Sequence, residues 1–306
     1  MTYPWAQSYW VALNIVLIFV AVFYCKKNPP LWFLAGLIFF YPVFRGIILG
    51  QFALMIGATL IIAYRMVSEP GRFLRFLAGV LLAWCCMKPH MVILLVMFFI
   101  LQMIRDQNIY SILGLLTGGV LFAGISFLLY PNWLSEWISL VTDYAGYLNY
   151  HPIIGAWLSA FSIDWSEIWL KIVIGVIAAI ITALFAVYWY KRQLSDYIIL
   201  GWLVLVFELV NPNANSLLSD QILFLLPLLV WMDNPFIRSW VKSYTWGIFI
   251  IIPWILFFAF LKTYEPYEVA MGMAGTFSLW FLIILIKEDL FKRDKKHLRG
   301  DRLVDN

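Results

Sequence analysis

The segment AWCCMKPHMVILL (residues 83–95) carries a lysine, a proline and a histidine inside a long apolar run. Within residues 76–104, only Lys88, His90 and Gln102 have strongly polar side chains. One helix over this whole run would be about 44 Å long at a rise of 1.5 Å per residue, but the hydrocarbon core of a bilayer is about 30 Å thick. The run is therefore too long for a single straight crossing.

Pro89 offers a place to break it, because proline disfavours helical geometry in the residue before it, here Lys88. Two helices meeting at this point would each be about 20 Å long, slightly short of the bilayer core. We therefore expect the turn to lie below the outer surface, at the floor of a cavity. Non-helical backbone at that depth is tolerated only where it is buried in protein or lines water.

The whole chain has the composition of a membrane protein. Of its 306 residues, 64% are hydrophobic and 12% are charged, against about 45–50% and about 25% in ordinary globular domains. The apolar runs are continuous and do not alternate with a period of two, which favours helices over a barrel. The 16 Trp and 16 Tyr residues suit anchoring at the membrane interfaces. The composition therefore predicts an all-α polytopic membrane protein.

Eleven hydrophobic segments are candidates for transmembrane spans. The sequence before the first one, MTYPWAQSY, has no basic region, so we expect no cleavable signal peptide. The predicted spans cover residues 8–25, 31–49, 52–66, 74–87, 91–104, 111–130, 170–190, 197–211, 217–232, 246–262 and 270–287.

The basic residues agree with this number of spans. If the side holding Lys26 and Lys27 is called the inside and each span crosses once, 17 of the 21 Lys and Arg residues fall inside. By the positive-inside rule, the C-terminus is then cytoplasmic and the N-terminus is outside. We expect a multi-pass protein of a prokaryotic plasma membrane. The four basic residues left on the outer half are Arg45, Lys88, Lys171 and Lys262.

The chain is expected to form one transmembrane domain over residues 1–290, followed by a basic cytoplasmic tail over 291–306. Its long outer loop, residues 131–169, is rich in Trp and Tyr. Within that loop, LSEWISLVTDYAGYL has the apolar spacing of a helix, which predicts an amphipathic helix along the membrane surface.

Polar residues gather at the outer ends of the predicted spans. Each one has a simple structural explanation. Lys88 could extend to the lipid head groups and Arg45 could anchor the chain at the interface. His90 could be a buried structural histidine, and Gln51 and Asp220 could form hydrogen bonds at helix ends. Their location on one face favours a functional role, because ionisable groups at membrane depth are costly. Cations, amides and a carboxylate together suit a ligand with phosphate and hydroxyl groups. The group also includes Gly50, Pro89, Asp143, His151, Glu208, residues 211–216 and Gln221.

Motifs of soluble enzymes and of nucleic-acid binding are absent from the sequence. It has no P-loop, HExxH, GxSxG or Rossmann glycine pattern, and close helix packing explains GLLTGG (114–119) better than phosphate binding does. The three cysteines, Cys25, Cys85 and Cys86, are expected to be small buried hydrophobes. We therefore expect no metal site, no cofactor and no nucleic-acid partner.

Three stretches together resemble glycosyltransferase family 87, a family of integral-membrane transferases of the GT-C type. The stretch from Gly50 to Ile100 resembles the GQ…AG-L…KPQ pattern of the family, LYPNWLSEWI resembles its P-x-W-x-x-x-W segment, and SDQILFLLPLL resembles its YDQ-x-L-L-L-P-L-L segment. The matching positions are Gly50, Gln51, Lys88, Pro89, Asp220 and Gln221; His90 stands where glutamine is common and Ser219 where tyrosine is common.

The resemblance implies transfer of a sugar from a polyprenyl-phosphate donor to an acceptor at the outer face. GT-C enzymes have a first span followed by an outer loop with a catalytic aspartate, whereas the family pattern begins here near YPWAQSYW and no Asp precedes Asp106. The chain is therefore expected to lack that span and loop, which a partner chain could supply. Membrane lipids and the lipid-linked sugar are the other expected partners.

Under this hypothesis the polar residues divide by role. Lys88, with Arg45 and His90, would bind the donor phosphate. The polar pocket for the sugar would contain Gln51, Asn213, Gln221, Glu208 and His151. Asp220 is the first candidate for the base that takes the acceptor proton, with Glu208, Asp143 and His151 as further candidates.

Two other functions remain open from the sequence. The chain could be a non-catalytic membrane subunit, or a degenerate GT-C homologue that retains the body as a scaffold or lipid-binding unit. It could also be a transporter, although a transporter would favour broken helices in two matching halves, and the sequence has one broken pair and no repeat.

Overall fold

A computed structural model describes residues 3–26, 28–147, 152–164, 168–210, 217–260 and 267–300, with side chains over 5–26, 28–140, 152–164, 168–210, 219–260 and 268–287. All regular elements in these ranges are helices, as the composition predicts. They are α1 (Tyr3–Cys25), α2 (Leu31–Phe39), α3 (Tyr41–Ile48), α4 (Ala53–Val67), α5 (Arg72–Cys85), α6 (Pro89–Arg105), α7 (Ile109–Leu129), α8 (Trp133–Tyr147), α9 (Ile153–Ala160), α10 (Ile168–Tyr190), α11 (Asp196–Val210), α12 (Leu217–Asp220), η1 (Gln221–Phe224), α13 (Leu225–Met232), α14 (Ser239–Ala259) and α15 (Tyr267–Gly300).

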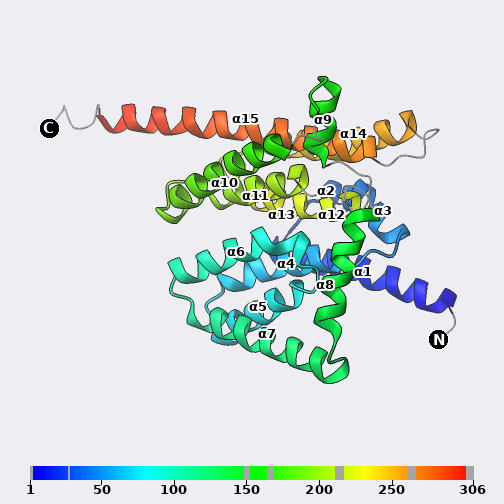
Figure 1. Cartoon of the computed structure of the whole chain (residues 1–306). Helices are drawn as coiled ribbons and strands as arrows, with labels where there is room; N and C mark the ends of the chain where they lie inside the picture. The colour runs from blue at the N-terminus through cyan, green and yellow to red at the C-terminus, as the bar shows by residue number, and fades with distance from the viewer. Residues whose placement is uncertain are drawn as a thin grey trace.

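The bundle has two layers of roughly parallel and antiparallel helices (Figure 1). One layer contains α1 and α4–α7, and the other contains α10, α11, α13, α14 and α15. The layers meet where α11 and α10 contact α6 and where α12 and α13 contact α4. Aromatic rings fill this core, including Phe98 against Trp189, with ring centroids 4.6 Å apart, and Phe224 stacked on Phe277 at 4.1 Å.

Helices long and apolar enough to cross a membrane are present within the described ranges. Five single helices qualify, namely α1, α7, α10, α14 and the part of α15 from Glu268 to Lys287, and the bent pair α2–α3 makes a sixth. Three apolar segments are shorter: α4, α6 and the stretch Gln221–Met232. The structure thus agrees with a polytopic membrane protein, while the predicted count of eleven spans is not confirmed.

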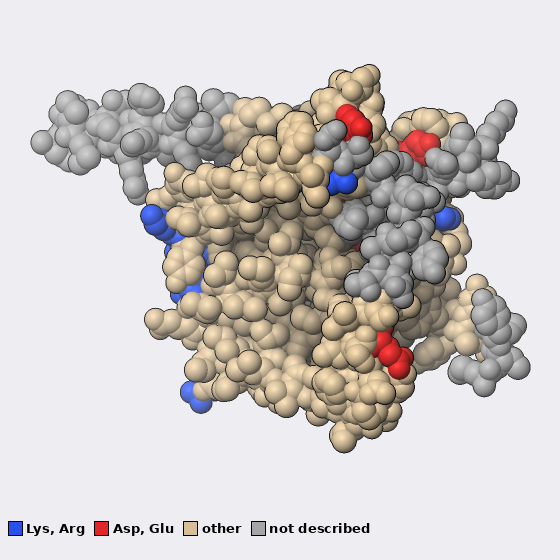
Figure 2. Space-filling view, in the orientation of Figure 1, with Lys and Arg blue, Asp and Glu red and all other residues tan. Residues whose placement is uncertain are grey.

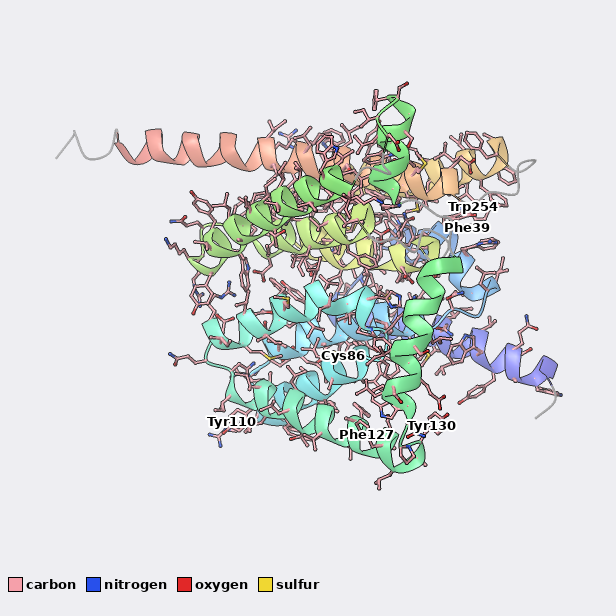
Figure 3. All side chains as sticks on the ribbon, in the orientation of Figure 1. Phe39, Cys86, Tyr110, Phe127, Tyr130 and Trp254 are labelled. Carbon is pink, nitrogen blue, oxygen red and sulfur yellow. The ribbon has the colours of Figure 1, made fainter. Side chains whose placement is uncertain are left out.

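A helix lies within each of the eleven predicted spans, but the span at 31–49 is not one straight helix. It divides at Phe40, whose ψ of 115° is extended, and α2 and α3 differ in direction by 47°. Pro42 in the first turn of α3 contributes to this break, because it has no N–H to continue α2. The break frees the carbonyl of Phe39, which accepts a bond from the Trp254 indole at 2.7 Å, where the two residues meet in Figure 3.

The glycine-rich stretch GLLTGG packs closely against α5, which confirms the interpretation from sequence. A Cβ added at Gly114 would lie 1.9 Å from the carbonyl oxygen of Phe76, and one at Gly79 would lie 2.0 Å from that of Ser111. Gly118 faces Val80 and Ala83 of α5, but Gly119 has nothing within 4 Å. Small residues therefore allow α5 and α7 to approach each other at backbone distance.

Two of the described elements belong to the predicted outer loop. The helix expected over LSEWISLVTDYAGYL is present as α8, which runs across the ends of the bundle helices instead of along them (Figure 1). Just before it, at the end of α7, the hydroxyl of Tyr130 donates to the Glu136 carboxylate of α8. Tyr110 lies at the opposite end of α7 from Phe127 and Tyr130 (Figure 3). The short helix α9 was not predicted, and α15 continues as far as Gly300 into the predicted tail.

Surface charge differs between the two ends of the bundle. Figure 2 shows a broad uncharged face, with most of the visible Lys and Arg side chains at the left end and the visible Asp and Glu in the right half. The left end includes the turns α6–α7 and α10–α11, where Arg192 and Arg105 bond Asp106. We call it the basic end, and the end that contains α8 the α8 end. This separation is the pattern expected of a membrane protein with one basic face.

Candidate functional site

The two residues that matter most in the sequence argument lie in contact at the α8 end. The Lys88 ammonium forms a hydrogen-bonded ion pair with the Asp220 carboxylate. Lys88 precedes Pro89, the first residue of α6, and its φ of −121° and ψ of 69° are not helical, which confirms the predicted break. Asp220 ends the short helix α12, 132 residues further along the chain. The break therefore directs Lys88 toward a carboxylate from the other layer.

Burial within this pair is unequal. The Lys88 side chain is 16% exposed and that of Asp220 is fully buried. An ammonium has three donors, and the bond to Asp220 uses one of them. Lys88 therefore keeps donors and some exposure for another anion, whereas Asp220 is enclosed behind it.

Further polar groups surround the buried side of the pair. Glu208 of α11 and Gln221 of η1 are both fully buried. Glu208 interacts electrostatically with Asp220 and Lys88, and the exposed His90 interacts with both members of the pair as well. Gln221 donates to the carbonyl oxygen of Ala270 on α15 at 3.0 Å. The structure thus brings together five of the predicted site residues from α6, α11, α12 and η1.

Two oxygens in this group have no hydrogen-bond partner among the described residues. They are Oδ2 of Asp220 and the side-chain oxygen of Gln221, whereas Glu208 interacts with the Gln221 side chain. Buried polar atoms are normally hydrogen-bonded, and those without a partner call for an explanation such as a bound water, an ion or a catalytic role.

The turn before α4 also lies at the α8 end, and its glycine has a structural role. Gly50 has φ of +62°, its N–H bonds to the carbonyl of Ile47, and the N–H of Gln51 bonds to that of Gly46. This is the Schellman pattern that ends a helix, here α3, and it needs a residue that tolerates positive φ. The conformation of Gly50 therefore ends α3 and sets the position of Gln51 in the turn before α4.

Arg45 is in the same helix, α3, which contacts α12 and therefore approaches the end that carries Asp220. Its Nε is buried and has no partner in the part of the chain that the structure describes. The structure puts Arg45 on a neighbouring element of the pair, but Arg45 forms no ion pair with Asp220.

An aromatic stack that sequence reasoning missed adjoins this turn. Trp10 of α1 stacks on Phe52, with ring centroids 6.4 Å apart and an interplanar angle of 19°, and Phe52 meets Trp84 at 5.2 Å. Trp84 lies one helical turn before Lys88. The sequence signal for this stack was weak, because 16 tryptophans are spread over the chain. The stack also joins residues far apart in the chain, from α1, from the turn before α4 and from α5.

Asn213 and His151 lie outside the described residues, as does the side chain of Asp143. Within the described ranges no three His, Cys, Asp or Glu side chains are grouped so that they could hold a metal ion.

Taken together, these features define a helical membrane protein with a buried charged site where the break between α5 and α6 meets the end of α12. The comparison with protein families then identifies the class: residues 1–212 match the model of glycosyltransferase family 87, and the chain belongs to that family. No curated protein and no solved structure matches the chain.

Proposed function

We propose that this protein transfers a sugar from a polyprenyl-phosphate donor to an acceptor at the outer face of the membrane. The observation that carries the proposal is the Lys88–Asp220 pair at the α5–α6 break in a member of this glycosyltransferase family. We further propose eleven crossings with the α8 end outside, since most of the Lys and Arg side chains visible in Figure 2 lie at the basic end.

In such a transfer the bond between the anomeric carbon and the phosphate oxygen breaks, and the phosphate gains negative charge as it leaves. A cation fixed beside that oxygen stabilises the transition state more than the ground state. Lys88 suits this task because its side chain is partly exposed and Asp220 holds its ammonium in place. Arg45 and His90 are the further candidates to contact the phosphate.

The acceptor hydroxyl must lose a proton to a base. Asp220 stays a candidate, although its burial and its bond to Lys88 suit a positioning role better. To act as a base it would have to exchange the ion pair for the acceptor hydroxyl. Glu208 is enclosed in the same way.

The sugar would be held by groups around the same turn. Gln51 and Gln221 offer amides to its hydroxyls, as does Asn213. The stack of Trp10, Phe52 and Trp84 adds an aromatic surface beside them, against which the apolar face of a sugar ring could lie.

A second candidate function is a non-catalytic membrane body. The enclosure of Asp220, Gln221 and Glu208, all fully buried, favours it, because none of the three reaches the surface. Such a body would keep the ion pair for stability alone.

Turnover of a lipid-linked sugar separates the two functions. Purified protein in nanodiscs would receive radiolabelled polyprenyl-phosphate hexoses, and labelled product or released sugar would be measured. The proposal predicts turnover that falls by about 10²-fold or more in Lys88→Gln, the size expected on removing one electrostatic stabiliser, and that is unchanged in the exposed control Lys191→Gln. Absence of turnover with every donor, with and without added lipid acceptor, would favour the non-catalytic body.

A further inference from the structure

A small cavity lies near the end of α1, away from the Lys88–Asp220 site. Its volume is about 180 Å³, and it lies between the end of α1, the start of α2, the end of α13 and the start of α14. Its walls are partly apolar, with Phe33, Met232 and Trp32, and its polar groups are Lys26, Lys242 and Ser239. Neither lysine belongs to the proposed transferase site.

Positive charge exceeds negative charge around this cavity. Lys26 pairs with Asp233 at 3.2 Å, and Lys242 donates to the backbone carbonyl of Asn234 at 2.8 Å. The two ammonium groups repel each other across the cavity, and Asp233 attracts both. The side chain of Asp233 is 49% exposed, so solvent weakens its effect. Two lysines therefore share one partly screened carboxylate.

The size and shape of the cavity limit the ligand. Sites for drug-sized molecules measure about 300–1,000 Å³, so a cavity of about 180 Å³ suits a single small group. The lysines suit an anion, and the adjacent Trp32 and Phe33 suit an attached apolar chain. Ser239 adds a hydroxyl and begins α14, whose first N–H groups have no partner within the helix.

We propose that this cavity binds a phosphate group, with the phosphate of an anionic phospholipid as the ligand that its apolar wall fits. Basic pockets between transmembrane helices at the cytoplasmic side bind phospholipid head groups in this way. The proposal is independent of the transferase activity, because it uses different residues in a different part of the bundle.

The test compares matched variants of the full chain in nanodiscs. Lys26→Gln/Lys242→Gln removes both cations from the cavity, and Lys191→Gln/Lys287→Gln removes two exposed lysines outside it, with the same change in net charge. Retention of phosphatidylglycerol over phosphatidylcholine is measured by native mass spectrometry. We expect affinity for phosphatidylglycerol to fall tenfold or more in the cavity variant and to stay within twofold in the control.

The variant Asp233→Asn should change the affinity for phosphatidylglycerol in the opposite direction. It removes the carboxylate that competes for the lysines, so affinity for phosphatidylglycerol should rise several-fold. A misfolded protein would not bind the lipid more tightly, so a gain of affinity in this variant cannot be explained by misfolding.

A second arm identifies the source of the phosphate. Inorganic phosphate alone is added to the protein in phosphatidylcholine nanodiscs, and thermal unfolding is followed. A shift that depends on Lys26 and Lys242 means that a free phosphate group suffices; retention of phosphatidylglycerol without that shift assigns the ligand to the lipid. If the cavity variant equals the control for both ligands, or if Asp233→Asn weakens binding, the proposal is overturned.

Discussion

At the scale of single residues, the ion pair between Lys88 and Asp220 is the feature on which the site depends. The sequence indicates each residue separately, one through the broken apolar run and the other through its place at the start of a span. Their contact could not be predicted, because it joins elements 132 residues apart and depends on how the two layers pack. The pairing changes the interpretation of Asp220 from a base toward a residue that positions Lys88.

Removing one partner of this pair should lower the free energy of unfolding more than removing both partners does. Lys88→Met leaves Asp220 buried without a counter-charge, and the free energy of unfolding should fall by about 3–5 kcal/mol. Lys88→Met/Asp220→Leu removes both charges and should recover most of that loss. Chemical unfolding in micelles measures both, with Lys191→Met as an exposed control expected to change by less than about 0.5 kcal/mol. A double variant as unstable as the single one would mean that Asp220 is not the partner that makes Lys88 important.

At the scale of elements, the sequence predicts helix positions well because apolar runs and their breaks are local properties. The break at Lys88, the presence of helix α8 and the packing of GLLTGG all follow from local pattern and residue size. The bend at Phe40 was missed because the apolar run continues through it, and α9 was missed because eight residues give too little periodicity. The stack of Trp10, Phe52 and Trp84 was missed because it depends on tertiary contacts.

The packing of α7 on α5 predicts that alanine substitutions of different glycines in α7 affect stability very differently. Gly114→Ala would place a methyl group against the backbone of Phe76, where no flexible side chain can give way. Overpacking of this kind costs about 1–3 kcal/mol, and occasionally more.

Gly119→Ala is the control in the same helix, because its Cβ would meet nothing within 4 Å. It should leave stability unchanged or raise it by up to about 1 kcal/mol, as alanine is the better helix former. Thermal unfolding in micelles compares the two, and equal destabilisation by both would contradict the packing of α7 on α5.

The helices α4, α10 and α11 are joined through one carboxylate near the basic end. Asp196 accepts bonds from the Tyr64 hydroxyl at 2.8 Å and from the Trp189 indole at 2.7 Å. Hydrogen bonds to charged groups contribute about 1.5–3 kcal/mol each, so Asp196→Ala should lower the free energy of unfolding by about 2 kcal/mol or more. Asp106→Ala, which loses only partly exposed ion pairs, should cost about 1 kcal/mol or less. Similar losses for both variants in chemical unfolding would argue against Asp196 as the link.

At the scale of the whole molecule, the separation of charge between the two ends predicts the orientation in the membrane. In a background without the three native cysteines, Asn132→Cys beside α8 should react with an impermeant maleimide on intact cells. Lys191→Cys, in the α10–α11 turn, should react only after the cells are permeabilised. The reverse pattern would place the α8 end, and the Lys88–Asp220 site with it, on the cytoplasmic side.

The most direct measurement of the central claim is the affinity for a polyprenyl-phosphate sugar in nanodiscs, compared between wild type and Lys88→Met/Asp220→Leu. This variant lacks the proposed phosphate contact and is expected to keep its fold. The account predicts that Kd rises at least tenfold, a loss of about 1.4 kcal/mol of binding free energy. Equally tight binding by both proteins would contradict the assignment of Lys88 to the donor phosphate.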